Sequence, residues 1–136
     1  MNPVIFNKLE RLKEEVGYLS GHKNDFLETI KTSLETKKIV ERSVYLCAEI
    51  TLDIADLIII KKGYPKPATY SETIYKLGDY GIIPKEFAYH IVYLAGLRNF
   101  LAHDYQKNTI PELEQFLKRG LGDMKQFLKE IKKGVS

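Results

Sequence analysis

The chain has 136 residues, of which 44% are hydrophobic and 29% are charged, and its net charge at pH 7 is +3. This length and composition predict one globular domain over residues 1–136. So small a positive excess permits nucleic-acid binding without implying it. The single cysteine, Cys47, excludes an intramolecular disulfide and a multi-cysteine zinc site, and its apolar neighbours predict a buried thiol.

Targeting and membrane-spanning segments are not expected. No N-terminal stretch has the basic, apolar and small-residue order of a signal peptide. The longest apolar run, residues 57–60, is far shorter than the ~20 residues that a membrane helix requires. We therefore expect a cytoplasmic protein without a membrane partner.

Apolar residues recur at helical spacing in the first half of the chain. A first helix is expected from the Asn-Pro pair at residues 2–3 to the Ser-Gly pair at 20–21. A second, long helix is expected to begin at the capping-box pattern of residues 32–35 and to end at the Lys-Lys-Gly of 61–63. Whether residues 20–34 break this helix or continue it stays open.

Three more helices are expected after the proline-containing turn at residues 64–67. A short helix with a capping box covers 69–81, a fourth helix covers 84–105, and an amphipathic fifth helix covers 109–131. No segment alternates with a period of two, so no strand is expected. The sequence therefore predicts an all-α protein, an up-and-down bundle of four to five helices.

The fourth helix carries a cation on its apolar stripe. The stripe, spaced by four and three residues, is Phe87, Ile91, Leu94, Arg98, Leu101 and Tyr105. Arg98 and Tyr105 are seven positions apart, which is about 20° of rotation, so they share a face. A guanidinium there must meet an anion, a carbonyl or a solvated cleft. The candidate carboxylates are Glu41, Glu49, Asp53 and Asp56.

His103 does not share that face. It is five positions from Arg98, which is about 140° of rotation on an ideal helix. Either the helix changes geometry before His103, or a symmetry mate completes the site. The opposite flank of the helix is also apolar, which indicates contact with a second subunit and predicts a homodimer. That flank is Ala88, Val92, Tyr93, Ala95 and Leu97.

Each polar residue of this segment also has a structural interpretation. Arg98 could pair with a carboxylate of another helix, and His103 could bond the last carbonyls of its own helix. Tyr105 could be a half-buried core aromatic, and residues 104–108 could be a polar loop. Arg98 and His103 would then serve only the packing of a helical dimer. The joint occurrence of Arg98, Asn99, His103 and Tyr105 favours a site.

These residues carry a resemblance to a known family. Arg98-Asn99-xxx-His103-x-Tyr105 is similar to the Arg-x4-His-x-Tyr signature of HEPN domains of the HepT type, toxins encoded beside MNT-type minimal nucleotidyltransferases. Residues 41–55 resemble that family's second helix. The resemblance implies an α-helical homodimer and a metal-independent endoribonuclease that acts on RNA, with tRNA the favoured class.

The resemblance also implies a role for each residue. His103 would be the general acid or base on the ribose 2′-OH and the leaving oxygen, and Arg98 would hold the scissile phosphate at a cleft between two subunits. Asn99 would orient the pair. An imidazole and a guanidinium can perform this chemistry, giving a 2′,3′-cyclic phosphate, with no metal and no cofactor.

Tyr105 has a second implied role, as the acceptor of AMP. In some pairs the MNT-type nucleotidyltransferase antitoxin transfers AMP from ATP to this tyrosine and silences the toxin, so ATP enters only as the partner's AMP donor. The alternative function that stays open is a non-enzymatic helical subunit that binds this partner and is AMPylated by it.

The remaining histidines and lysines give weaker indications. Neither His22 nor His90 has a second ligand at metal spacing, so no metal site is predicted. The basic residues between 118 and 133 could help to hold RNA, but their pattern is more typical of a solvated helix face.

Overall fold

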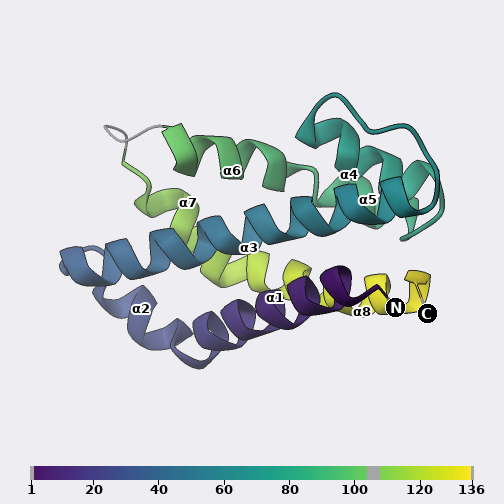
Figure 1. The fold of residues 1–136 in the computed structure, drawn as a ribbon. Helices are drawn as coiled ribbons and strands as arrows, with labels where there is room; N and C mark the ends of the chain where they lie inside the picture. Colours follow the sequence, from purple (N-terminus) through teal and green to yellow (C-terminus); the bar gives the residue numbers. More distant parts are fainter. Residues whose placement is uncertain (1, 104–107, 136) are drawn as a thin grey trace.

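The computed structural model describes residues 2–103 and 108–135, which form helices and no strand. The elements in chain order are α1 (Pro3–Gly21), α2 (Lys23–Thr29), α3 (Leu34–Lys61), α4 (Tyr70–Asp79), α5 (Lys85–His90), α6 (Tyr93–His103), α7 (Ile110–Gln115), the π-helical turn η1 (Phe116–Gly120) and α8 (Leu121–Val135). The chain runs alternately up and down a bundle, and its two ends lie at the same end of it (Figure 1). The predicted all-α, up-and-down architecture is confirmed.

The long helix α3 lies at the centre of the bundle and packs against α1, α4 and α6 (Figure 1). Because neighbours cover most of its circumference, its buried residues are not confined to one narrow stripe. Its buried apolar side chains are Val40, Val44, Cys47, Ala48, Ile50, Leu52, Ile54, Ala55, Ile58 and Ile59. Each large aliphatic side chain of this set contributes about 1.5–3 kcal/mol by leaving water. The prediction of a buried Cys47 is confirmed, and burial raises the pKa of its thiol.

Residues 20–34 do break the helix. The short helix α2 stands between α1 and α3, and α3 begins where the Ser33 hydroxyl accepts the Thr36 amide at 3.1 Å. The cap is therefore one residue later than the predicted capping box. At the other end Gly63 has a φ of 83°, a conformation that glycine adopts without strain, and α3 stops as predicted.

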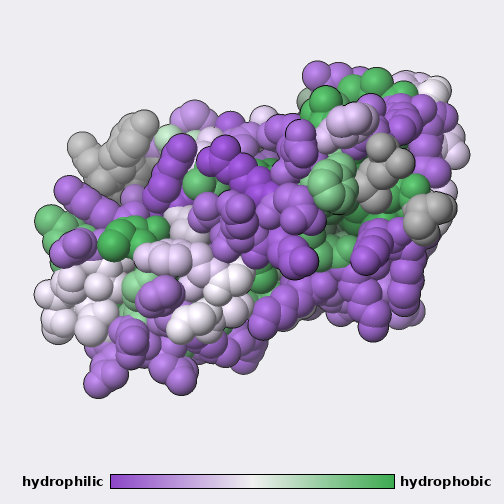
Figure 2. Space-filling model, turned by 60° about the horizontal axis from the view of Figure 1, so that its bottom comes forward, coloured by the Kyte–Doolittle hydropathy of each residue, from purple (hydrophilic) through white to green (hydrophobic). Residues whose placement is uncertain are grey.

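Helix α1 covers one side of α3 and also contacts α8. Its cap forms as predicted, because the Asn2 Oδ1 accepts the amides of Val4 and Ile5 at 2.8 and 3.3 Å. The face turned forward in Figure 2 is mostly hydrophilic, with smaller hydrophobic patches between the polar residues. Within the described ranges no helix has the length and hydropathy needed to cross a membrane.

The predicted fourth helix, residues 84–105, is wrong as a single element. It is broken into α5 and α6 at residues 91–92, where the amides of Leu94 and Ala95 bond the carbonyls of Ile91 and Val92, each at 3.1 Å. These are bonds to the third residue back, so the α-helical pattern is interrupted for one turn. The break leaves Ile91 fully buried while His90 and Tyr93 on either side both reach Asp123.

The predicted fifth helix is interrupted as well, at η1. The Leu121 amide bonds the Phe116 carbonyl five residues back, and Gly120 makes room for this turn. A Cβ at Gly120 would lie 2.4 Å from the Phe116 ring, so only glycine fits beneath that ring. The predicted cap also differs, since the Thr109 hydroxyl donates to Glu41 at 2.6 Å instead of capping α7.

Candidate functional site

Arg98 lies on the side of α6 that faces α3, and it meets an anion there. Its Nε donates to Glu49 Oε2 at 3.0 Å, and the two side chains are only 18% and 20% exposed. Glu49 is one of the four predicted candidates. The other three candidates have different partners: Glu41 accepts from Thr109, Asp53 pairs with Lys8, and Asp56 accepts from Thr73.

Two aromatic rings complete the surroundings of the guanidinium. The Arg98 Cζ lies 5.1 Å from the ring centroid of Tyr70 and 5.7 Å from that of Tyr45. The Tyr45 hydroxyl donates to Glu49 Oε2, the same oxygen that accepts the hydrogen bond from Arg98 Nε. Cation–π contact and a charge-assisted hydrogen bond together hold the guanidinium in one orientation.

The ion pair also fixes the protonation states. Burial lowers the pKa of Arg98, but the hydrogen bond and the charge of Glu49 outweigh it, so that the pKa is raised overall. The hydrogen bond to Glu49 is the largest of the causes that raise the pKa of the Tyr45 phenol. Arg98 therefore stays cationic and Tyr45 stays neutral throughout the physiological pH range.

Asn99 touches Arg98 directly. It is exposed, and its Oδ1 accepts from Arg98 Nη1 at 3.3 Å. This is a long hydrogen bond at the solvent side of the guanidinium, so it can bias the orientation of Arg98 only weakly. The role of Asn99 in orienting the site stays a prediction.

His103 is the last residue of α6 and is exposed. Because α6 is α-helical from Tyr93 to His103, the rotation of about 140° between Arg98 and His103 applies. The explanation by a change in helix geometry is therefore not supported, and the structure does not bring the two residues together in one chain. Tyr105, the other predicted site residue, lies outside the described residues.

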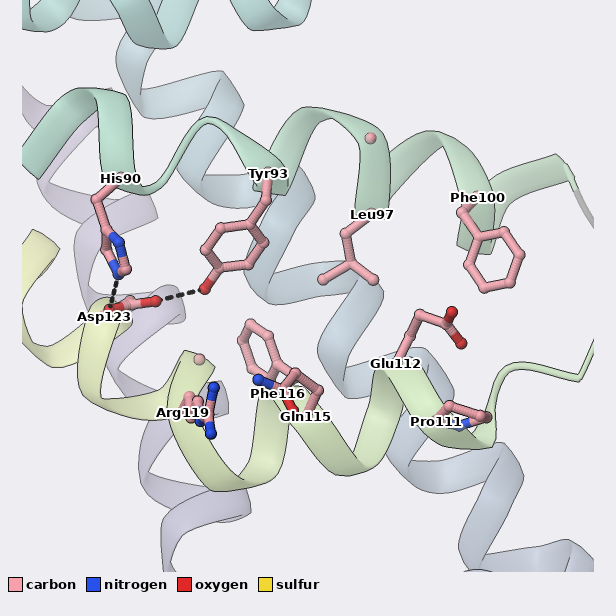
Figure 3. A pocket seen from close by; sticks show the side chains of 12 residues that line it. His90, Tyr93, Leu97, Phe100, Pro111, Glu112, Gln115, Phe116, Arg119 and Asp123 are labelled. Carbon is pink, nitrogen blue, oxygen red and sulfur yellow. Dashed lines mark hydrogen bonds and ion pairs between the residues drawn. The ribbon is translucent and has the colours of Figure 1, made fainter.

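The side of α6 that carries His103 borders a large groove. His103 follows Gly96 by seven positions and Phe100 by three, and both of these residues line the groove, whose volume is about 1030 Å³. Its far wall is α7 and η1, including Pro111 and Phe116. Leu97 and Phe100 point from α6 into this space (Figure 3). An open, mainly apolar groove beside a candidate catalytic residue is the feature that distinguishes this side of α6.

A cluster at the other end of the groove was not predicted. Asp123 Oδ1 lies 3.0 Å from His90 Nε2, and Asp123 Oδ2 accepts from the Tyr93 hydroxyl at 2.6 Å (Figure 3). Burial, followed by this hydrogen bond, raises the pKa of the Tyr93 phenol. No local sequence signal points to the cluster, because Asp123 is 33 and 30 residues away from its two partners.

The weaker sequence indications can also be placed. His22 Nδ1 lies 2.9 Å from the Tyr18 carbonyl at the α1–α2 junction. Lys118, Arg119, Lys125 and Lys129 are exposed, as on a solvated helix face. In the part of the chain that the structure describes, no three or more His, Cys, Asp or Glu residues gather in a way that could hold a metal ion. The expectation of a metal-free site stays a prediction.

Comparison with known proteins agrees with this fold and identifies the family. The family described as Ribonuclease HepT-like matches residues 5–131. The chain is 34% identical over 106 residues to a tRNA nuclease HepT of Aphanizomenon flos-aquae, covering 77% of this chain and 72% of the relative. It is 27% identical over 139 residues to an mRNA nuclease HepT of Shewanella oneidensis, covering 97% and 98%.

A solved structure has the same fold. The tri-AMPylated Shewanella oneidensis HEPN toxin, in complex with an MNT antitoxin, superposes with a TM-score of 0.87 at 24% identity, over 98% of this chain and 99% of that chain. The family match spans nearly all of the sequence, and it contains both Arg98 and His103. The chain belongs to the HepT-like ribonuclease family.

Proposed function

We propose that this chain is the toxin of a HEPN/MNT toxin–antitoxin pair, a metal-independent endoribonuclease whose site combines Arg98 of one subunit with His103 of a second. One observation carries the proposal. Arg98 is held in place by its own chain, while His103 stands exposed about 140° away on the same helix. Family membership and the nuclease relatives support the same activity.

The chemistry follows from the two side chains. Arg98 holds the scissile phosphate, and its planar guanidinium stabilises the charge that develops on the phosphoryl oxygens. An imidazole at His103 takes the proton of the ribose 2′-OH, which attacks phosphorus, and the imidazolium so formed gives a proton to the departing 5′-oxygen as its bond to phosphorus breaks. The products are a 2′,3′-cyclic phosphate and a 5′-hydroxyl.

The second subunit is a copy of this chain, seated on the groove side of α6. Tyr93, Leu97 and Phe100 present an apolar surface there, and Tyr93 is 38% exposed in the single chain. A homodimer with two-fold symmetry would place equivalent α6 helices against one another. Each copy then brings its His103 to the interface, where we propose that it meets the solvent-facing edge of the other copy's Arg98, beside Asn99.

The proposed substrate is RNA in the cytoplasm, with tRNA the favoured class. The relative with 34% identity is named a tRNA nuclease, whereas the relative with 27% identity is named an mRNA nuclease. The proposed partner is an MNT-type nucleotidyltransferase antitoxin, because the solved HEPN toxin is AMPylated and bound to an MNT antitoxin. Tyr105 is the proposed acceptor of AMP, with ATP as donor.

Cleavage of total tRNA in the presence of EDTA tests the activity. The wild-type protein is expected to cleave, and His103→Ala is expected to lose about 10²–10⁴-fold, the usual contribution of a general acid or base. Because His103 is exposed, the substitution should leave the unfolding temperature unchanged. Equal activity of the two proteins, or activity only with added metal, would disprove this mechanism.

Mixing two inactive variants tests the composite site. In a dimer of Arg98→Ala with His103→Ala, one of the two sites keeps an intact arginine and histidine if the residues come from different subunits. Random mixing should therefore restore about a quarter of the wild-type activity. If both residues acted within one subunit, the mixture would stay as inactive as each variant alone.

The alternative, a non-enzymatic subunit that is modified by its partner, has its own test. Incubation with the nucleotidyltransferase and ATP should add the mass of AMP to the wild-type chain and not to Tyr105→Phe. AMPylation of a chain that never cleaves RNA, alone or in excess over its partner, would favour this alternative.

A further inference from the structure

A second recess lies beside the candidate site. It has a volume of about 340 Å³, between α3 and the C-terminal end of α6. Its lining residues are Lys38, Glu41, Arg42, Tyr45, Leu101 and Ala102. Leu101 is about one helical turn beyond Arg98, and Tyr45 also contacts the Arg98 guanidinium, so the recess adjoins the surroundings of Arg98.

Arg42 projects from α3 at this recess and shares an aromatic neighbour with Arg98. Its Cζ lies 5.5 Å from the ring centroid of Tyr45, and the Arg98 Cζ lies 5.7 Å from the same centroid. The two cations can therefore be no farther apart than these two distances added together. The hydroxyl of Tyr45 is anchored on Glu49, so the ring that both guanidinium groups contact is itself fixed.

Arg42 differs from Arg98 in its charge partners. Among residues 2–103 and 108–135 no carboxylate forms a salt bridge with Arg42, whereas Arg98 pairs with Glu49. Lys38 adds a second cation to the recess. Among the described residues that line the recess, the one acidic side chain is Glu41, which already accepts a hydrogen bond from Thr109 at 2.6 Å. These described lining residues are thus net cationic and suit a polyanion.

We propose that Arg42 is a second phosphate-binding residue of the RNA site, and that this recess receives the nucleotide next to the scissile phosphate. The inference rests on the proposed ribonuclease function. An RNA strand offers phosphates in close succession, and two guanidinium groups held against one ring contact two of them. The Arg98 phosphate is the one that reacts, and the Arg42 phosphate sets the position of the strand.

The test is the salt dependence of RNA binding, measured in the non-cleaving His103→Ala protein with end-labelled total tRNA. Loss of one phosphate contact makes the slope of log K against log salt shallower by roughly 0.7–0.9. Arg42→Ala is expected to show this change together with a several-fold loss of affinity, and Arg42→Lys to restore the slope. Arg11→Ala is the matched control, because Arg11 is an exposed arginine on α1, on the side of α3 away from α6 (Figure 1).

The outcomes separate the inference from the function on which it rests. If wild-type protein cleaves tRNA but Arg42→Ala has the same salt slope as Arg11→Ala, Arg42 contacts no phosphate and the inference is wrong. If Arg42 only braces Tyr45, cleavage slows while the slope stays unchanged, which overturns it too. If the wild-type protein neither binds nor cleaves RNA, the ribonuclease function itself fails.

Discussion

The two sides of helix α6 differ in how far the chain itself supplies partners for their side chains. The side facing α3 is called the completed side, and the opposite side is the groove side. On the side facing α3, Arg98 has a counter-ion in Glu49 and aromatic neighbours in Tyr45 and Tyr70. On the groove side, Leu97 and Phe100 border a space of about 1030 Å³. In the proposed mechanism, a single chain therefore preorganises the phosphate-binding Arg98 and leaves its proton-transferring partner, His103, to come from a second copy.

The largest combined effect on cleavage and on stability is expected on the completed side. Arg98→Ala should lower kcat/KM by roughly 10²–10³-fold, the range for losing one stabilising donor of a transition-state anion. It should also lower the unfolding free energy by about 1–3 kcal/mol, because Glu49 loses its partner in a largely buried position. Cleavage kinetics and chemical denaturation measure the two effects. Arg98→Lys keeps the charge without the planar guanidinium, so in both measurements it should lie between the wild type and Arg98→Ala.

The groove side is expected to control assembly instead of stability. Leu97→Glu should place a charge in the apolar groove, convert the proposed dimer to a monomer in sedimentation velocity, and abolish cleavage. Its unfolding temperature should change little more than that of Val4→Glu, a control on α1 where the side chain is 53% exposed. A wild-type protein that is already monomeric at micromolar concentration would remove the basis for this difference.

Two glycines form a matched pair: Gly120 in the wall of the groove, and Gly122 two residues beyond it on α8. Gly120→Ala forces a methyl group to within 2.4 Å of the Phe116 ring and should destabilise the fold by about 1–3 kcal/mol. A Cβ at Gly122 meets nothing within 4 Å, and Gly122→Ala should stabilise α8 by up to about 1 kcal/mol. Thermal unfolding measures both. Shifts in the same direction would mean that the ring does not rest on Gly120.

The smallest effect is expected from a change at Tyr45, again on the completed side. Tyr45→Phe keeps the ring beneath the two guanidinium groups and removes the hydroxyl that donates to Glu49. The unfolding free energy should fall by about 0.5–1.5 kcal/mol, the usual net value of one hydrogen bond. Cleavage should change by no more than a few-fold, whereas a collapse of activity would show that the hydroxyl itself takes part in the site.

Much of the fold could be predicted because helix ends carry their own chemistry. Asn2, Thr69 and Gly63 mark helix boundaries through side-chain caps or a positive φ, and those boundaries formed as expected. The breaks at residues 91–92 and 116–120 were missed. Apolar spacing continues through both, so periodicity alone cannot reveal a change of hydrogen-bond pattern.

The sequence predicted which types of residue form the site, but not how α6 is aligned along α3 and hence which residues meet. Burial of Arg98 required an anion, a carbonyl or a solvated cleft, and for the anion the sequence offered four candidate carboxylates. Only the position at which α6 crosses α3 selects Glu49 among them. The angle between Arg98 and His103 followed from helix geometry alone. By contrast, the cluster at Asp123 depends on contacts across 30 residues and more, which no local pattern encodes.

The turn η1 has a consequence for length variation within the family. A π-helical turn holds one residue more than an α-helix needs over the same stretch, as the bond from Leu121 to Phe116 shows. The Leu121 amide takes the carbonyl bond that the residue before it would take in an α-helix, so deleting one residue there would restore a regular helix without turning α8 relative to α7. Asp123 would then stay beside His90 and Tyr93. A one-codon deletion in this segment should therefore keep both the bundle and the acidic anchor at one end of the groove, whereas an extra residue in a regular helix would turn α8 by about 100°.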